Sequence, residues 1–504
     1  MNPPLLHRTW LRLLLWGTAS FLTLLVVLLT WLNWSGARRL QTTRSALEAQ
    51  GESLDFRRHT RDPLPPESNF CSIEALRDLA AVEQGDVNRG PSAARRKRLE
   101  QLELKAAAHL KSAARPDLPS GSLTGKAADL KAWAAYLGPK AEPAADPSTA
   151  ARRLLELFKP HEPLIAELIG GLNRQGAQWT PEWRALDLPE RLLMLPVPHY
   201  NGLQKLQQLL LLRGCAAAQL GEADKAMVTL HLMLRLAQAS FNDPFLIGHL
   251  VGLSQLSHAC NLLWEITHRH LGRPEDYQQI RQWLAAIELR RSFLHTSRGE
   301  LAMGYGTLVF LRNSKAAEQR RELAVLLGGD WLTALMPKGW YDLNAARLIE
   351  LELQQIIVPL REKGLRAAAE AAAEMPSPSG TLDRLLNPGS MLASMIMPSL
   401  RPITAQTLRA QALIDLANTA CALEQWRGQQ GSYPKDLAQL ANTTPLPADQ
   451  HSGKALHYRL QADGSFRVWC IGPDLKDDQG NRGKFAAGKI TSLSDQGDWV
   501  WGGP

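Results

Sequence analysis

The chain has 504 residues, which is enough for two or three domains with cores of their own. Hydrophobic residues make up 45% of it and charged residues 21%, a composition that excludes global disorder and predicts a folded protein. The net charge is +8, and the five cysteines stand far apart without a CxxC pair, which excludes a disulfide framework.

The N-terminus carries an uncharged apolar segment that runs from Leu13 to Leu32. As an α-helix it spans about 30 Å, the thickness of the hydrocarbon core of a bilayer. Tryptophans, which favour the membrane interface, lie near its two ends: Trp10, Trp16, Trp31 and Trp34. The small residues Ser35 to Ala37 leave a cleaved signal peptide as the alternative, but the segment exceeds the roughly 7–15 apolar residues of a signal sequence. Residues 1–35 are therefore predicted to be a cytoplasmic stub and a transmembrane helix that contacts the lipid bilayer through Leu13 to Leu32.

The orientation of this anchor is not set by charge. Arg8 and Arg12 precede the apolar segment and Arg38, Arg39 and Arg44 follow it, so the positive-inside rule gives nearly a tie. No second apolar segment of this length follows, and the rest of the chain is expected to lie on one side of the membrane.

The next residues are predicted to form a tether and then a large helical domain. Residues 36–70 include the proline-rich stretch "TRDPLPPESN", which indicates an extended tether. Residues 71–374 repeat apolar side chains at spacings of three and four, the pattern of α-helices. Within them Arg213 to Pro244 resembles one tetratricopeptide-like helix pair that turns at Leu220 and Gly221. Because no second copy follows in register, we expect an irregular array of helical hairpins.

One basic cluster in this domain raises the question of nucleic-acid binding. Arg95, Arg96, Lys97 and Arg98 open a helical pattern, and no aromatic or glycine residues are interleaved with them. We interpret the cluster as the solvated face of a helix and expect no nucleic-acid partner.

A proline- and methionine-rich linker, residues 375–402, follows the helical domain. Its apolar centre, Met391 to Met397, is expected to pack on the helical domain rather than dock a partner or the bilayer.

The C-terminal region, residues 403–504, changes from a purely helical to an α+β pattern. A long amphipathic helix ends near Gly428 to Gly431, and Pro434 is expected to start a short helix. Two alternating strands flank Asp463-Gly464, a strong hairpin signal, and "DWVW" forms a last strand. The chain as a whole is thus predicted to be mainly α, with a long helix packed on a three-stranded antiparallel sheet at its end.

Two cysteines belong to this C-terminal core. Cys421 lies on the apolar face of the long helix and Cys470 on the apolar face of the second strand. We expect them to be buried, to face each other and to stay reduced, because a helix-to-sheet distance near 10 Å exceeds the reach of about 7 Å between bonded Cα atoms.

The motifs of this region resemble the globular head of type II secretion major pseudopilins. The similarity rests on "LANTACALEQWRGQQGSYPKDLAQL", on "SGKALHYRLQADGSFRVWCIGPDLKDD" and on the closing "DQGDWVW", and it covers a fifth of the chain. The same pattern, together with "MPKGWYDLNAARL", is similar to large single-anchor envelope proteins of planctomycete and verrucomicrobial bacteria, for which no activity is established. The resemblance implies an inner-membrane protein whose bulk is periplasmic.

The N-terminus departs from the pseudopilin pattern. The stretch "SFLTLLVV" has Phe21 and Thr23 in place, but Ser20 replaces the glycine at which a prepilin is cleaved and no glutamate follows. More than 350 residues separate the apolar segment from the head-like helix. The chain is therefore not expected to polymerise as a pilus subunit.

The stretch "CIGPDLKDDQGNRGK" is a candidate calcium-binding loop. Calcium takes six to eight oxygen ligands from carboxylates and backbone carbonyls, and the resemblance implies that Asp474 and Asp498 clamp one ion. Asp477 and Asp478 are further candidate ligands. The alternative is a hydrophilic hairpin whose aspartates cap turns, and the cations Lys476, Arg482 and Lys484 in the loop favour it.

Catalytic motifs fail on inspection, so no catalytic residue is predicted. "SGSLTGKAAD" lacks the spacing and the Ser/Thr of a phosphate-binding loop, and "GLSQL" around Ser254 lacks the last glycine of a nucleophile elbow. His258, His268 and His270 do not fall on one helical face. The leading hypothesis is a non-enzymatic envelope scaffold or interaction protein, linked to secretion or envelope assembly, with protein partners. The alternative is an envelope hydrolase with its site in a cleft of the helical domain.

Overall fold

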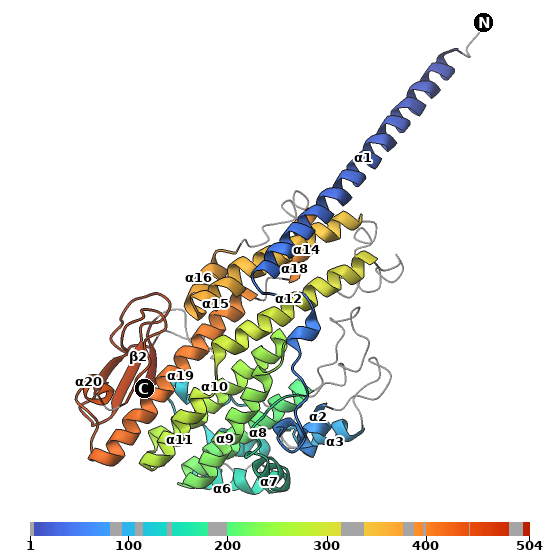
Figure 1. The fold of residues 1–504 in the computed structure, drawn as a ribbon. Helices are drawn as coiled ribbons and strands as arrows, with labels where there is room; N and C mark the ends of the chain where they lie inside the picture. Colours follow the sequence, from blue (N-terminus) through green and yellow to red (C-terminus); the bar gives the residue numbers. More distant parts are fainter. Residues whose placement is uncertain are drawn as a thin grey trace.

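The computed structural model describes residues 5–80, 93–105, 114–138, 144–179, 199–313, 337–375, 388–396, 400–442, 444–482 and 497–503. It is mainly helical, with one small antiparallel sheet near the C-terminus, as the sequence predicts (Figure 1). The helices are α1 Leu5–Ala49, α2 Glu74–Ala80, α3 Ala93–Gln101, α4 Gly121–Thr124, α5 Leu130–Leu137, α6 Pro147–Phe158, α7 Glu162–Gly170, α8 His199–Gln219, α9 Ala223–Phe241, α10 Leu246–His268, α11 Pro274–Ala285, α12 Leu289–Asn313, α14 Lys338–Glu352, α15 Val358–Glu362, α16 Leu365–Ala373, α18 Met391–Ile396, α19 Leu400–Gln430 and α20 Leu437–Ala441. The strands are β1 His457–Leu460, β2 Phe466–Cys470 and β3 Trp499–Gly502.

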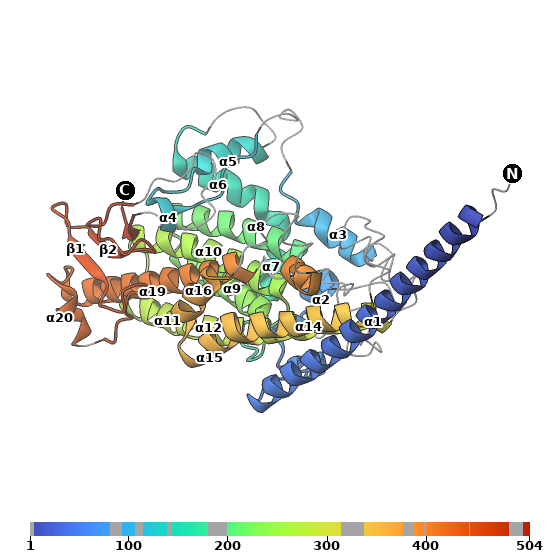
Figure 2. The same ribbon diagram turned by 90° about the horizontal axis from the view of Figure 1, so that it is seen from above.

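Helix α1 projects from a body formed by the other elements (Figures 1 and 2). The large apolar side chains of its first half are exposed, and Trp16 and Leu24 keep 73% and 68% of their surface. Among the described residues, α1 is the helix that is long and apolar enough to cross a membrane. Leucines exposed on every side of a helix are stable in lipid rather than in water, which supports a single N-terminal membrane-spanning helix.

Helix α1 continues beyond the apolar segment to Ala49 instead of giving way to an extended tether. One face of this second half is buried, because Gly36, Thr43 and Leu47 recur at helical spacing against the body, where α14 packs on α1. The segment expected to be a tether, residues 36–70, is therefore helical over its first part.

Helices α1 and α14 cross at two glycines. A β-carbon built on Gly36 would lie 2.3 Å from the carbonyl oxygen of Gly339, so a larger residue cannot occupy this position without moving the helices apart. Polar contacts flank the crossing on both sides. The Gly339 amide donates to Oδ1 of Asn33 at 2.7 Å, and the Arg39 guanidinium donates to both carboxylate oxygens of Glu350 at 3.0 and 2.8 Å. The crossing therefore fixes α1 on the body.

The residues after α1 are also bound to the body. Glu52 is buried and forms ion pairs with Arg298 of α12 and Arg361 of α15. At the end of the proline-rich stretch, Asn69 exchanges hydrogen bonds of 2.7 and 2.9 Å with the backbone of Gln178. The proline-rich stretch thus ends in a turn at residues 66–68 and in a buried contact, rather than as a free linker.

The predicted helix pair from Arg213 to Pro244 is confirmed. Helices α8 and α9 pack against each other and turn at Gly221, whose φ of +75° favours glycine. Helix α10 packs on both of them, and the three helices contribute many of the residues of the main hydrophobic core. They form the centre of the body (Figure 2).

The C-terminal sheet has the order β1-β2-β3 and is antiparallel throughout. The hairpin between β1 and β2 turns at Gly464, with φ +80°, and the Ser465 amide donates to Oδ1 of Asp463 at 2.9 Å. Helix α20 starts later than expected from Pro434. Its N-cap is Asp436, whose carboxylate accepts the amide of Gln439 at 3.0 Å and so satisfies a free donor of the first turn.

Helix α19 packs on helices of the body as well as on the sheet. It contacts α10, α11 and α16 of the body and β2 and β3 of the sheet. Trp264 of α10 donates its indole N–H to the carbonyl oxygen of Gly502 at 3.2 Å, which joins the last strand to the body. The C-terminal module therefore shares one continuous hydrophobic core with the helical domain.

A buried carboxylate organises the end of α19. Glu424 accepts hydrogen bonds from the Tyr433 hydroxyl, from Nε of Arg427 at 3.2 Å and from Nδ1 of His270 at 3.1 Å. These contacts account for the spacing of glutamate, arginine and tyrosine in "ALEQWRGQQGSYP", because the chain turns back after α19 and places Tyr433 over the helix end.

The described part of the linker packs as predicted. Leu392 and Ala393 of α18 are buried, and their backbone amides donate to Oδ1 of Asn344 on α14 at 2.8 and 3.4 Å. Residues 376–387 and 397–399 of the linker lie outside the described residues.

Cys421 and Cys470 are buried and unbonded, as predicted. Burial raises the pKa of both thiols well above the ordinary value. Cys421 lies near Cys260 of α10, whereas Cys470 lies near Asp449. That the two thiols face each other stays a prediction.

Candidate functional site

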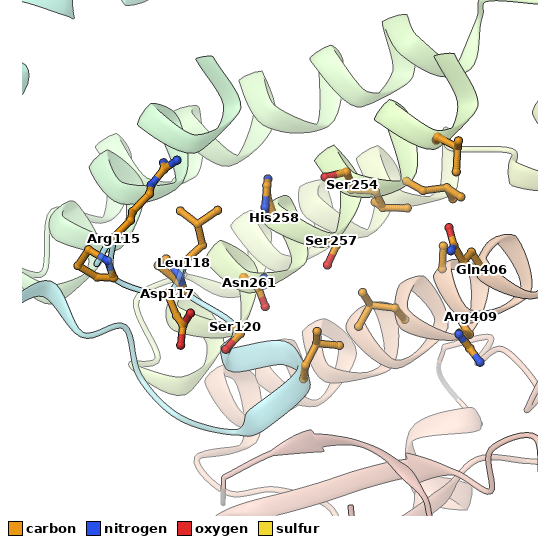
Figure 3. Close-up of a pocket in the computed structure, with 18 residues that line it drawn as sticks. Arg115, Asp117, Leu118, Ser120, Ser254, Ser257, His258, Asn261, Gln406 and Arg409 are labelled. Carbon is orange, nitrogen blue, oxygen red and sulfur yellow. The ribbon is translucent and has the colours of Figure 1, made fainter. Parts of the chain in front are cut away.

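A cavity of about 680 Å³ lies between α10, α19 and the extended residues 115–120 (Figure 3). We call it the α10–α19 groove. Its lining residues come from three segments: Arg115, Pro116, Asp117, Leu118, Pro119, Ser120 and Leu123; Leu250, Leu253, Ser254, Leu256, Ser257, His258 and Asn261; and Gln406, Arg409, Ala410 and Leu413. The groove combines leucines with amides, hydroxyls and two arginines, so it is suited to an amphipathic ligand.

Helical spacing explains why these side chains line one groove. On α10 the residues from Leu250 to Asn261 recur at intervals of three and four, which places them on one face of the helix. On α19 the residues from Gln406 to Leu413 follow the same rule. Two facing helical stripes form the walls.

The third wall is the proline-containing segment 115–120, which is held by side chains of the body. The Trp133 indole donates to the carbonyl oxygen of Asp117 at 2.9 Å. Arg115 lies over the ring of Trp133, 5.2 Å from its centroid, and donates to Oε1 of Gln208 at 2.7 Å. Asn261 accepts the amide of Ser122 at 3.1 Å, just beyond this segment. The wall is therefore fixed to α5, α8 and α10.

The two arginines of the groove are separated from each other. In Figure 3 Arg115 and Arg409 lie at opposite ends of the lining. Burial lowers the pKa of Arg409, and Asp117 brings a carboxylate to the wall near Arg115. The groove thus carries two cationic groups and one anionic group among leucines and uncharged polar side chains.

His258 is the group most suited to acid–base chemistry in the groove. Burial lowers its pKa to about 4, so the ring is neutral at neutral pH. Its Nδ1 atom is buried and has no hydrogen-bond partner among the described residues. Ser254 and Ser257 line the groove beside it, but no hydrogen bond joins either hydroxyl to the ring within that part of the chain. A serine nucleophile needs a base within hydrogen-bond reach and a third group that orients the base, and neither condition is met here.

Sequence reasoning considered Ser254 and His258 only as failed catalytic motifs and did not predict the groove. The signal was present, because Ser254, Ser257, His258 and Asn261 form a polar stripe at helical spacing on this helix. The partner wall on α19 lies about 150 residues further along the chain, and only the tertiary structure brings it to this stripe.

The aspartate loop joins the second strand to the last strand, as the sequence suggested. Oδ1 of Asp474 accepts the amide of Lys476 at 3.2 Å, and Oδ2 accepts the amide of Gly497 at 3.4 Å. Asp498 is buried, and its Oδ2 accepts the amide of Gly480 at 2.7 Å. Both aspartates therefore connect the two ends of the loop through backbone amides.

The two other candidate ligands have separate partners. Oδ1 of Asp477 accepts the indole N–H of Trp469 at 3.0 Å and the amide of Gln479 at 2.9 Å. The backbone carbonyl of Asp478 accepts both the amide and the side chain of Asn481, at 3.2 and 2.7 Å. Both are the contacts of turn residues.

Among the described residues of this loop, a calcium ion finds an incomplete donor set. Oδ1 of Asp498 is buried without a hydrogen-bond partner, which suits a cation, and burial raises the pKa of this carboxyl to about 6. However, across the described residues no three acidic, histidine or cysteine side chains converge as metal ligands. The guanidinium of Arg482 also lies in the loop and donates to the carbonyl oxygens of Val500, Gly502 and Gly503. The described residues fit turn-capping better than ion binding, and residues 483–496 of the loop lie outside them.

Comparison of the chain with protein-family models, curated proteins and solved structures found no match. The resemblance to pseudopilins therefore stays a prediction that rests on the motifs of the C-terminal region.

Proposed function

We propose that the protein is a single-anchor interaction protein of the bacterial envelope, with its body in the periplasm. It binds an extended segment of a partner protein in the α10–α19 groove and performs no chemistry there. The link to secretion or envelope assembly comes from the pseudopilin-like motifs of the C-terminal module.

The observation that carries the proposal is the composition and length of the groove. The stripe on α10 from Leu250 to Asn261 covers eleven residue steps, or about 16 Å at 1.5 Å per residue. An extended chain advances about 3.3 Å per residue, so about five residues fit along it. Leucines from all three wall segments line the groove, and Arg115 and Arg409 lie at its two ends. The matching segment is apolar in its middle and acidic at its ends.

The hydrolase alternative has one supporting observation, since Ser254, Ser257 and His258 line the same groove. The missing partner of His258 Nδ1 argues against it, because a general base must be held in place by a further group. A serine-reactive phosphonate probe separates the two readings. Labelling that depends on His258 would replace our proposal with the hydrolase.

The test uses the purified full-length protein in detergent and two synthetic peptides. One peptide has three leucines flanked by aspartates, and the other has the same leucines flanked by lysines. We expect fluorescence anisotropy to show binding of the acidic peptide and much weaker binding of the basic one, because the arginines at the groove ends attract carboxylates.

Two variants make this test specific to the groove. Ala410→Trp fills the groove from α19 and should abolish peptide binding. Ile247→Trp places the same side chain on α10 at a position that is 48% exposed and outside the groove, and it should leave binding unchanged. Binding that survives Ala410→Trp would refute the proposed site.

A further inference from the structure

The body of the protein begins where the apolar segment of α1 ends. Leu32 is the last residue of that segment, and a β-carbon built on Gly339 would lie 2.2 Å from its carbonyl oxygen. The next residue, Asn33, accepts the Gly339 amide at 2.7 Å. The first turn of α14 therefore touches α1 at the boundary of the apolar segment, with no spacer between membrane span and body.

Helix geometry places this contact relative to a bilayer. The segment from Leu13 to Leu32 spans about 30 Å, the whole hydrocarbon core, so Leu32 lies at the edge of that core. The headgroup layer adds about 5–7 Å on each side of the core. Arg38 lies six residues beyond Leu32, or about 9 Å further along the axis. Residues 33–36, and the α14 turn that contacts them, lie at the level of the headgroups, and the Arg38 side chain leans back towards that level, with its guanidinium over the Trp34 ring.

The connection between span and body is rigid. Helix α1 contains no proline from Leu5 to Ala49, and it is continuous through the crossing with α14. The Arg39–Glu350 contact lies beyond the crossing, and Glu52 is bound to α12 and α15 at the end of the helix. A body held at several points along a continuous helix cannot swing away from the bilayer, as it would on a flexible tether.

The exposed groups at this level suit a lipid surface. Trp31 and Trp34 are exposed on α1, and Arg38 lies over the Trp34 ring, 5.3 Å from its centroid. Lys338 is exposed on the first turn of α14. Indole rings and basic side chains are the groups that favour the membrane interface, where lipid phosphates accept their hydrogen bonds.

We propose that the body sits directly on the bilayer, with the first turn of α14 in the headgroup layer and with Lys338 and Arg38 bound to lipid phosphates. The inference rests on the membrane anchoring included in the proposed function. In place of the expected flexible tether, it gives a rigid connection that holds the body against the bilayer.

The test measures the distance of single positions from the lipid surface. The five native cysteines are buried in the structure, so a new exposed cysteine can be labelled selectively. Lys338→Cys in the full-length protein is labelled with a fluorophore and reconstituted into vesicles of phosphatidylcholine and phosphatidylglycerol that contain a headgroup-attached nitroxide quencher. We expect strong quenching at this position.

The matched control is Lys454→Cys, the same change at an exposed lysine of the C-terminal module. That module lies at the end of the body away from the free end of α1 (Figures 1 and 2), so this label should be quenched several-fold less. Within the Lys338→Cys protein, Arg38→Glu should reduce quenching in vesicles with phosphatidylglycerol, because a glutamate is repelled by anionic lipids.

Carbonate extraction separates failure of this inference from failure of the anchor. If the protein resists extraction but the label at position 338 is quenched no more than the label at 454, the body is not seated on the bilayer and the inference is wrong. If the protein is extracted, the anchor itself fails and the proposed function falls with it.

Discussion

Glu52 and Arg298 form a two-point ion pair, in which Nε and Nη2 of the guanidinium lie 2.6 and 2.8 Å from the two carboxylate oxygens. Nη1 of Arg361 adds a third contact of 2.7 Å to the same carboxylate. Glu52 is buried, whereas the two arginines are partly accessible. One carboxylate thus holds the end of the anchor helix against α12 and α15.

Removing this charge should destabilise the body. Glu52→Gln leaves two guanidinium groups without their anion, and we expect a loss of about 2–4 kcal/mol in the free energy of unfolding, measured by denaturant titration in detergent. Glu48→Gln is the control, because Glu48 is exposed and its contact with Arg44 is 3.7 Å long. It should cost less than about 1 kcal/mol. Equal effects of the two variants would contradict a structural role for the Glu52 ion pairs.

The Glu424 cluster predicts a ranking of two tyrosine variants. Tyr433→Phe removes a donor from a buried carboxylate, and we expect a cost of about 1.5–3 kcal/mol, as for hydrogen bonds to charged groups. Tyr458→Phe removes a hydrogen bond of 2.8 Å to the neutral carbonyl oxygen of Pro434, which should cost about 0.5–1.5 kcal/mol. Thermal unfolding of both variants checks the order. A larger loss of stability in Tyr458→Phe than in Tyr433→Phe would show that Glu424 does not depend on the Tyr433 hydroxyl.

Two buried carboxyl groups predict how stability depends on pH. Burial raises the pKa of Glu300 to about 7, and burial together with the nearby Glu300 raises the pKa of Glu352 well above its ordinary value. Both carboxylate oxygens of Glu352 lack a hydrogen-bond partner among the described residues. The folded chain therefore holds these protons more tightly than the unfolded chain. The stabilising contribution of Glu300 is complete below the ordinary pKa of about 4.5 and is lost as the pH rises through about 7, whereas that of Glu352 is lost as the pH rises from the same ordinary value towards its own raised pKa.

The variant Glu352→Gln isolates this effect, because glutamine has the shape of the protonated acid and cannot ionise. We expect its melting temperature to exceed that of the unchanged protein at pH 8 and to approach it at pH 4.5. The slope of wild-type stability should reach about 1.4 kcal/mol per pH unit for each proton involved. Glu370→Gln, on the exposed side of α16, is the control. The difference between its melting temperature and that of the wild type should be about the same at pH 8 and at pH 4.5. A constant difference between Glu352→Gln and wild type across this range would refute the assignment.

The calcium prediction is tested by thermal unfolding of the full-length protein in millimolar calcium and in excess chelator. The contacts of Asp474 and Asp498 with backbone amides favour the turn-capping reading, so we expect the same melting temperature in both buffers. Asp498→Ala should lower the melting temperature in both, because the Gly480 amide loses its acceptor. A rise of the melting temperature with calcium that disappears in Asp474→Ala would establish the ion site instead.

Topology is tested with reporters fused after Pro504. We expect an alkaline phosphatase fusion, which is active only in the periplasm, to be active. A fusion to a fluorescent protein that matures only in the cytoplasm should be dark. The opposite pair of results would place the body in the cytoplasm and remove the envelope assignment.

Local sequence signals predicted most of the elements. The apolar segment, the turn at Gly221 and the hairpin at Gly464 follow from composition and from residues that favour a positive φ, and the structure contains all three. The second half of α1 was harder to predict, because its burial depends on α14, about 300 residues away. Helix α20 begins at Leu437, after its N-cap Asp436, rather than at Pro434, since the side chain that caps the first turn decides the start.

The candidate site could be predicted only in part. The polar stripe on α10 is visible in the sequence, but a stripe on one helix does not reveal which helix faces it. The four aspartates of the C-terminal loop were identifiable as turn or ligand residues, but which N–H groups donate to them depends on what the fold brings within reach. Sequence patterns give the chemistry of side chains, whereas long-range packing gives their partners.

Helix α19 makes the C-terminal module inseparable from the body, and this affects how truncations must be interpreted. The same helix supports the sheet through one part of its surface and supplies Gln406, Arg409, Ala410 and Leu413 to the groove wall through another. A chain that stops at residue 402 therefore loses the groove along with the sheet, and it exposes the leucines of α10 to water. The phenotype of this truncated chain would combine the loss of the groove with the loss of the sheet. Point substitutions on one side of α19 or the other are the way to assign a role to each.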